Sequence, residues 1–236
     1  MKITTVKVAA ILLLSLLVKL NAAQAGQEPT ASPDPFQQRV PGVSLRNQDV
    51  IDGIAMLSRE AGLTVSVEYR LGKKISGSAP QRGTLIANVG PGTVSEILDG
   101  LCALDGEFTW KRDGNMTNVL PRASAGDPSY FLNRTISELT FRDTKNVQDA
   151  VFGTAAALPG PKEQIAIMQT GVPLTFSRSW NATFHDVTVR EAFNLIAKEL
   201  GPNYGWQFSG ADDFRILTFH QGILPKPGRV GDTGAR

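Results

Sequence analysis

One helix-to-strand unit occurs twice in this chain, and its repetition constrains the fold more than any other feature. The first copy begins with the sequence TVSE at residues 93–96, and the second begins with TVRE at residues 188–191, 95 residues later. Each tetrapeptide is a capping box, in which Thr and Glu exchange side-chain-to-backbone hydrogen bonds at the start of a helix. We therefore interpret the chain as two copies of one supersecondary unit.

The same features follow both capping boxes. Apolar residues recur with the i, i+3, i+4, i+7 spacing of one buried helix face. A glycine then ends each helix, and an aromatic, strand-like run follows it. The matching positions are Val94, Ile97, Leu98, Leu101, Gly106 and Trp110 in the first copy, and Val189, Ala192, Phe193, Ile196, Gly201 and Trp206 in the second.

The first half of the chain predicts the element order β-α-β-β-α-β-β. A strand at residues 43–45 precedes a helix that Asn47 or Asp49 caps and Gly62 closes. The alternating residues 64–69 predict a half-buried strand. The remaining predicted elements are a polar loop at 71–83, a strand at 84–89, the capped helix, and a hairpin of 108–111 with 118–121 around the turn residues 113–115.

The second half predicts the same order, with a longer first helix. That helix begins at Val147, is broken at residues 159–161 by Pro-Gly-Pro, and resumes as a helical pattern over 162–170. The predicted strands are 139–141, 172–176, 182–187, 206–208 and 214–219. We therefore predict an α+β fold of two tandem β-α-β-β-α-β-β domains, at residues 43–122 and 137–221, each with two helices on a small mixed sheet.

The ends of the chain and the segment between its halves predict no packed structure. Residues 1–25 read as a signal peptide, with Lys2 and Lys7 before an apolar run and an A-x-A cleavage site that ends at Ala25. The apolar run, near 11 residues, is too short to span a bilayer. We expect a disordered Pro-rich linker at 26–42, a linker at 123–136 and a disordered tail at 222–236.

Charge and cysteine content narrow the function classes. Removal of residues 1–25 takes away three lysines and no acid, so the formal net charge falls from +2 to about −1. A basic surface for nucleic acid is therefore not expected. Cys102 is the one cysteine, so an exported chain has no disulfide framework, and we expect a buried thiol there.

The first half resembles the short N-terminal domain shared by secretins and TonB-dependent receptors. The resemblance rests on the strand at 43–45, the helix at 50–62, the strand at 64–69 and the sequence TVSEIL at 93–98 that leads to Trp110. Residues 165–176 and 188–206 fit the same pattern, whereas the break at 159–161 departs from it. The resemblance implies a periplasmic domain that contacts other proteins, with no catalytic residues to carry over.

Few residues suit catalysis or metal binding. The two histidines, His185 and His220, fall in different predicted elements, and no nucleophile elbow is present. We interpret His185 as an exposed surface residue; a hydrolase that uses it as a base is the third alternative. Two histidines and one buried cysteine do not supply the ligands of a zinc site. We therefore expect no enzyme activity, no metal and no cofactor.

The sequence thus favours an exported, periplasmic or secreted, non-enzymatic interaction module, associated with an outer-membrane secretin or a TonB-dependent system. Its expected partner is an envelope protein, without nucleic acid and without stable membrane insertion after cleavage. Trp180 is the leading candidate contact residue, because Trp is enriched in binding hot spots, and Lys73, Lys74 and Arg82 suit an acidic partner. The alternative is a protein that binds a small molecule or glycan in a cleft between the two copies.

Overall fold

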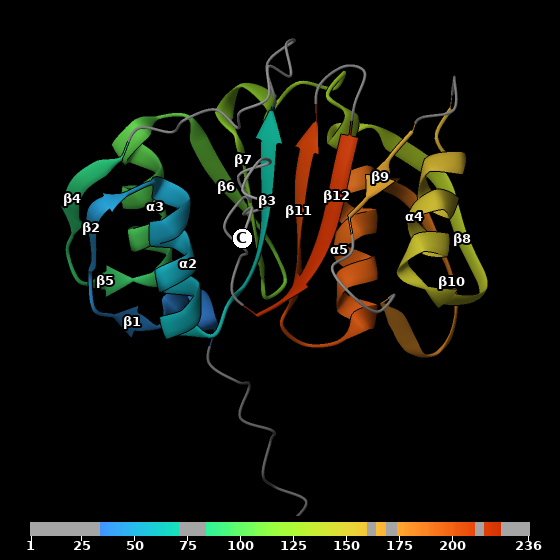
Figure 1. Ribbon diagram of the computed structural model, residues 1–236, viewed down its shortest axis with the longest axis horizontal. Helices are drawn as coiled ribbons and strands as arrows, with labels where there is room; N and C mark the ends of the chain where they lie inside the picture. The colour runs from blue at the N-terminus through green and yellow to red at the C-terminus, as the bar shows by residue number, and fades with distance from the viewer. Residues whose placement is uncertain (1–33, 71–83, 160–163, 169–173, 211–214, 223–236) are drawn as a thin grey trace, which may run out of the picture. The chain divides into compact units, whose positions relative to one another are not determined.

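The computed structural model describes residues 34–70, 84–159, 164–168, 174–210 and 215–222 (Figure 1). Contacts divide the chain into Met1–Asp34 and Pro35–Arg236, and all elements described below belong to the second unit. Among the described residues, no helix has the length and apolarity needed to cross a membrane. The predicted signal peptide, the residues Lys73, Lys74 and Arg82, and most of the predicted tail lie outside the described residues.

The first half contains two helices and short strands in the predicted order. Two small elements precede the first predicted strand. The elements are η1 (Pro35–Gln37), β1 (Arg39–Val40), β2 (Val43–Gln48), α2 (Val50–Ala61), β3 (Thr64–Arg70), β4 (Leu85–Val89), β5 (Gly92–Thr93), α3 (Val94–Asp105), β6 (Phe108–Asp113) and β7 (Met116–Pro121).

The second half repeats this order after two 3-10 turns. Its strands β8 and β10 are much longer than the matching β2 and β4. The elements are η2 (Arg122–Ser124), η3 (Phe131–Asn133), β8 (Thr135–Asn146), α4 (Val147–Ala156), β9 (Ala166–Ile167), β10 (Thr175–Thr188), α5 (Val189–Leu200), β11 (Tyr204–Gly210) and β12 (Arg215–Gln221).

Strand pairing follows the same scheme in both halves. The first and third strands form an antiparallel pair, β2 with β4 and β8 with β10. The other strands lie in the orders β6-β7-β3 and β11-β12-β9, in which the first pair is antiparallel and the second parallel. The α+β class is therefore confirmed.

The two halves share one six-stranded sheet, in the order β6-β7-β3-β11-β12-β9 (Figure 1). Its central seam is the parallel pair of β3 and β11, which aligns Glu68 with Phe208. Gly205 allows the close approach, because a Cβ atom at this position would lie 2.1 Å from the carbonyl oxygen of Val65. Hydrogen bonds of the backbone therefore continue from one half into the other.

The helices of the two halves cover opposite faces of this sheet. Val65 and Val67 of β3 belong to the core that α2 and α3 complete. Phe208, which belongs to the core with α5, is aligned with Glu68 and so points to the other face. Glu68 is consequently carried to the side of the sheet where the second half packs.

The local predictions for the capped helices are confirmed. Both boxes form, with Thr93 and Glu96 at the start of α3 and Thr188 and Glu191 at the start of α5. The predicted apolar faces are buried, with at most 1% of each side chain exposed. Gly106 ends α3 in the left-handed conformation, as a C-cap glycine does.

Three predictions for the second half are wrong. Residues 166–167, placed in a helical pattern, form β9, which pairs in parallel with β12. The predicted strands 172–176 and 182–187 are not separate, because 175–188 form the single strand β10; residues 172 and 173 lie outside the described residues. The first helix begins at Val147 as predicted, but it ends at Ala156 and has 10 residues against the 12 of α2, so it is not longer than its counterpart. A short apolar run such as 165–168 suits a helix or a strand equally, and the pairing with β12 decides.

Two segments expected to stay unpacked are packed where they are described. Phe36, only 1% exposed, stacks on Trp110, and β1 pairs with β5. In the predicted linker 123–136, Leu132 and Ser124 are fully buried. Residues 35–40 and 123–134 therefore take part in the fold, while the division into two domains stays a prediction.

Candidate functional site

Trp180, the leading predicted contact residue, lies inside an aromatic cluster. Its ring stacks on Phe141 at a centroid distance of 4.0 Å and makes an edge contact with Phe176. Only 7% of the residue is exposed. Trp180 therefore presents almost no surface to a partner in this conformation, although its role in binding stays a prediction.

The two equivalent tryptophans make the same hydrogen bond. Trp110 donates from its indole Nε1 to Asp99 Oδ1, and Trp206 donates to Asn194 Oδ1, each over 2.8 Å. Asp99 and Asn194 occupy the same place in α3 and α5, six residues after the capping Thr. Each bond fastens a helix to the strand that follows it, which agrees with the packing role expected from the sequence.

The candidate chemical groups do not assemble into one site. Cys102 is 3% exposed, and burial raises the pKa of its thiol to about 11, so the thiol stays protonated at neutral pH. His185 is exposed, opposite Glu138 on the ribbon formed by β8 and β10. Burial lowers the pKa of His220 to about 4, opposed by the backbone of Gly222. Among the described residues, no group of three or more His, Cys, Asp or Glu side chains is arranged to hold a metal ion.

A buried ion pair crosses the seam between the halves. The Arg190 guanidinium donates from Nε and Nη2 to the two carboxylate oxygens of Glu68, and from Nη1 to Asn133 Oδ1 over 2.7 Å. Glu68 is fully buried and Arg190 is 7% exposed. Burial raises the pKa of Glu68, and the bonds from Arg190 oppose that rise. The pair holds the N-terminal end of α5 against β3.

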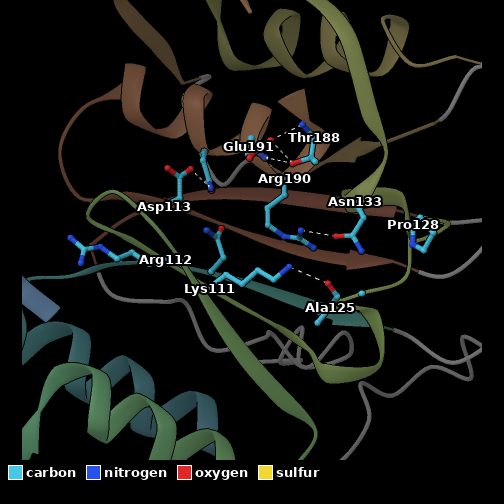
Figure 2. Close-up of a pocket in the computed structure, with 12 residues that line it drawn as sticks. Lys111, Arg112, Asp113, Ala125, Pro128, Asn133, Thr188, Arg190 and Glu191 are labelled. Carbon is cyan, nitrogen blue, oxygen red and sulfur yellow. Dashed lines mark hydrogen bonds between the residues drawn. The ribbon is translucent and has the colours of Figure 1, made fainter. Parts of the chain in front are cut away.

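A pocket of about 330 Å³ lies beside this ion pair (Figure 2). Figure 2 shows Lys111 and Arg190 extending toward the loop that carries Ala125 and Asn133. The pocket walls come from the hairpin β6–β7, this loop and the first two turns of α5. The lining residues are Lys111, Arg112, Asp113, Asn118, Ala125, Gly126, Pro128, Asn133, Thr188, Arg190, Glu191 and Asn194.

Most polar groups of this pocket are held by neighbours in the fold. Asp113 accepts from Asn194 over 2.7 Å and from Lys198 over 2.9 Å. Glu191 is engaged in the cap of α5. Asn118 differs, because its Oδ1 is buried and has no hydrogen-bond partner among the described residues, in a residue that is 2% exposed.

A second surface feature lies at the far end of the first half. Strand β4 pairs with β2, and no other described strand pairs with its second edge. Ile86, on the outward face of β4, is 83% exposed, the most exposed of the large apolar side chains among the described residues. The matching position in the second half is the polar Asn181, which accepts a hydrogen bond from the backbone of Asp143.

Sequence reasoning offered a cleft between the two copies as an alternative, but it identified no ligand-binding residue of this pocket, and it missed the ion pair and Ile86. Glu68 and Arg190 are 122 residues apart, and no pattern in the sequence links them. The alternation of residues 85–89 could have indicated that Ile86 and Asn88 share an outward face. Comparisons with protein-family models, with curated proteins and with solved structures found no match to this chain.

Proposed function

We propose that this protein is an exported, non-enzymatic interaction module of the cell envelope, which binds an extended segment of an envelope protein along the open edge of β4. Its proposed setting is a secretin or TonB-dependent system, in line with the resemblance of the first half to their short N-terminal domain. The observation that carries the proposal is Ile86, an exposed apolar side chain on a strand with a free edge.

The physical basis is strand addition. An edge strand has unpaired backbone N–H and C=O groups, which an extended peptide can pair. Its side chains then meet the outward face of the ribbon formed by β2 and β4, where Ile86 lies beside polar Ser44 and Asn88, themselves joined by a hydrogen bond of 3.0 Å. Burial of one Ile contributes about 1.5–3 kcal/mol, enough to bias binding toward this edge.

A non-enzymatic role agrees with the state of the reactive groups. The buried Cys102 thiol, with its pKa raised to about 11, is a poor nucleophile at neutral pH. His185 is exposed and faces Glu138 on the ribbon. The nearby hydroxyls of Thr140 and Thr183 bond to each other and Thr140 also donates to Glu138, so neither is held against the His185 ring.

The test is photo-crosslinking from Asn88 in the cells that produce the protein, followed by sequencing of the crosslinked peptide. A synthetic peptide of that sequence should bind the mature protein and protect the amides of β4 from hydrogen exchange. Ile86→Asp should weaken the peptide at least about tenfold, since 1.4 kcal/mol corresponds to a factor of ten. Asn181→Asp, which places the same charge at the matching position of the other ribbon, should leave binding unchanged. The proposal would be contradicted if Ile86→Asp left the affinity for the peptide unchanged, or if the peptide protected the amides of another surface from hydrogen exchange.

A further inference from the structure

The pocket beside the ion pair is not used by the proposed strand addition, and its chemistry points to a ligand. Its walls come from both halves, and every residue that lines it belongs to the part of the chain that the structure describes. At about 330 Å³ it is at the small end of the range typical of ligand pockets. A ligand as small as a single sugar or a dipeptide fits within this volume.

The acids in and under this pocket already have hydrogen-bond partners in the fold. The Glu68 carboxylate accepts from Nε and Nη2 of Arg190, and the Asp113 carboxylate accepts from Lys198 and Asn194. The Glu191 carboxylate accepts two hydrogen bonds from Thr188. These pairs leave the pocket with fixed polar walls that need not move when a ligand enters.

Two neighbouring side chains keep unused capacity. Lys111 and Asn118 are directly opposite each other in the β6–β7 ladder, so their side chains leave the same face of the sheet as near neighbours. The Lys111 ammonium has three donors. It donates to the neutral carbonyl oxygen of Ala125, at 3.1 Å, and its charge also helps to lower the pKa of the buried Glu68, whose oxygens accept from Arg190. Asn118 presents a buried acceptor, Oδ1, which has no partner among the described residues.

A buried acceptor without a partner is unfavourable, so Asn118 Oδ1 calls for a donor, which a bound water or a ligand can supply. The complement of Lys111 is an anion, and the complement of Asn118 Oδ1 is a hydroxyl, amine or amide N–H. Because the two side chains are adjacent, the ligand must carry both groups close together.

We propose that this pocket binds a small carboxylic acid that carries a hydrogen-bond donor next to its carboxylate. The carboxylate contacts Lys111, and the donor reaches Asn118 Oδ1. Hydroxy acids, amino acids and sugar acids share this chemistry, either as free molecules or as the end of a glycan or peptide. The site does not depend on the open edge of β4, so either proposal can fail without the other.

The test uses the mature protein with matched probes, and it measures binding by calorimetry and by the shift in melting temperature. Lactate and glucuronate carry both groups, propionate carries only the carboxylate, and glycerol carries only the hydroxyls. A glucuronate-ended oligosaccharide and a dipeptide of D-alanine distinguish a polymer end from a free acid. We expect saturable binding by at least one probe that carries both groups, and none by propionate or glycerol.

Variants separate a binding site from a structural one. Lys111→Gln should weaken binding at least tenfold, whereas Lys145→Gln, an exposed lysine of β8, should not change it. Asn118→Leu should abolish binding while the ligand-free melting temperature stays the same or rises, because the variant removes an unpaired buried acceptor. The proposal would be overturned if no probe that carries both groups binds at concentrations up to ~10 mM, since binding that weak corresponds to less than about 3 kcal/mol. Binding that survives both Lys111→Gln and Asn118→Leu would overturn it as well.

Discussion

At the scale of single residues, His220 ties the stability of the fold to pH. Its ring lies on β12 next to Gly205 at the seam, and both ring nitrogens are buried. The backbone of Gly222 favours the protonated ring, but burial outweighs it. Burial lowers its pKa to about 4, whereas an unfolded chain has a histidine pKa near 6.5. Between these values the unfolded chain binds the proton and the folded chain does not.

We therefore expect the stabilising contribution of neutral His220 to be complete above about pH 6.5 and to be lost as the pH falls toward 4. The loss is at most about 3 kcal/mol, from the size of the shift. Urea unfolding at several pH values would measure it. His220→Gln should flatten the curve in this window, while His185→Gln, on the exposed ribbon, should leave the slope unchanged.

The Glu68–Arg190 pair predicts that the loss of one charge costs more stability than the loss of both. Arg190→Leu leaves the Glu68 carboxyl group buried without its partner and should cost about 3–5 kcal/mol in the free energy of unfolding. The double variant with Glu68→Leu removes both charges, so it should cost less than the single variant. Denaturant unfolding of the four proteins in the double-mutant cycle gives the answer. A cost below about 1 kcal/mol for Arg190→Leu would show that the pair is not buried in solution.

At the scale of elements, the seam between β3 and β11 depends on a missing side chain. A Cβ atom at residue 205 would lie 2.1 Å from the carbonyl oxygen of Val65, and neither backbone can move without opening the ladder. Gly205→Ala should therefore destabilise the fold by about 1–3 kcal/mol or more. The amides of β3 and β11 should then exchange faster with solvent.

Gly153 supplies the matched control for this substitution. It lies inside α4, where an added Cβ would meet nothing within 4 Å. Gly153→Ala should stabilise the protein by up to about 1 kcal/mol, because alanine favours a helix more than glycine does. Equal effects of the two substitutions would contradict the close approach at the seam.

The two capping boxes predict that loss of either capping Thr lowers the stability of the protein by a similar amount. Thr93→Ala and Thr188→Ala each remove the side-chain acceptor at the start of a helix, with an expected cost of about 1 kcal/mol. Thr→Ser at either position keeps the hydroxyl and should cost much less. Thermal unfolding of the four variants compares the boxes directly, and a cost for only one of them would show that the copies differ in their caps.

At the scale of the whole molecule, the shared sheet makes a prediction about cooperativity. Independent domains would unfold in two steps, whereas a ladder that runs from β3 into β11 couples the halves. The ion pair from Glu68 to Arg190 and the contact from Asp113 to Lys198 add to this coupling. We expect one transition by calorimetry, with equal calorimetric and van't Hoff enthalpies. Two separated transitions in the unmodified protein would show that the seam does not form in solution.

Patterns within a few residues were enough to predict a large part of the fold. Both capping boxes, the buried faces of α3 and α5 and the left-handed Gly106 follow from hydrogen bonds and contacts between residues three or four positions apart. The hairpin of β6 and β7 follows from its turn. The short run at 165–168 failed for the converse reason, since its local pattern suits two conformations and a distant strand chooses between them.

The candidate sites, in contrast, depend on contacts between residues far apart in the sequence. Lys111 and Asn118 are brought together by a hairpin that the sequence predicts, yet the pocket exists only because the loop after β7 and the start of α5 close over that hairpin. Glu68 meets Arg190 across 122 residues of chain, and Trp180 lies in a cluster with rings from two strands. By itself, the sequence determined the elements and their caps, because the energies that form them act between near neighbours in the chain. Only the tertiary structure decided that the halves join edge to edge through β3 and β11, because that pairing depends on backbone groups common to every strand and on one glycine that leaves room for them.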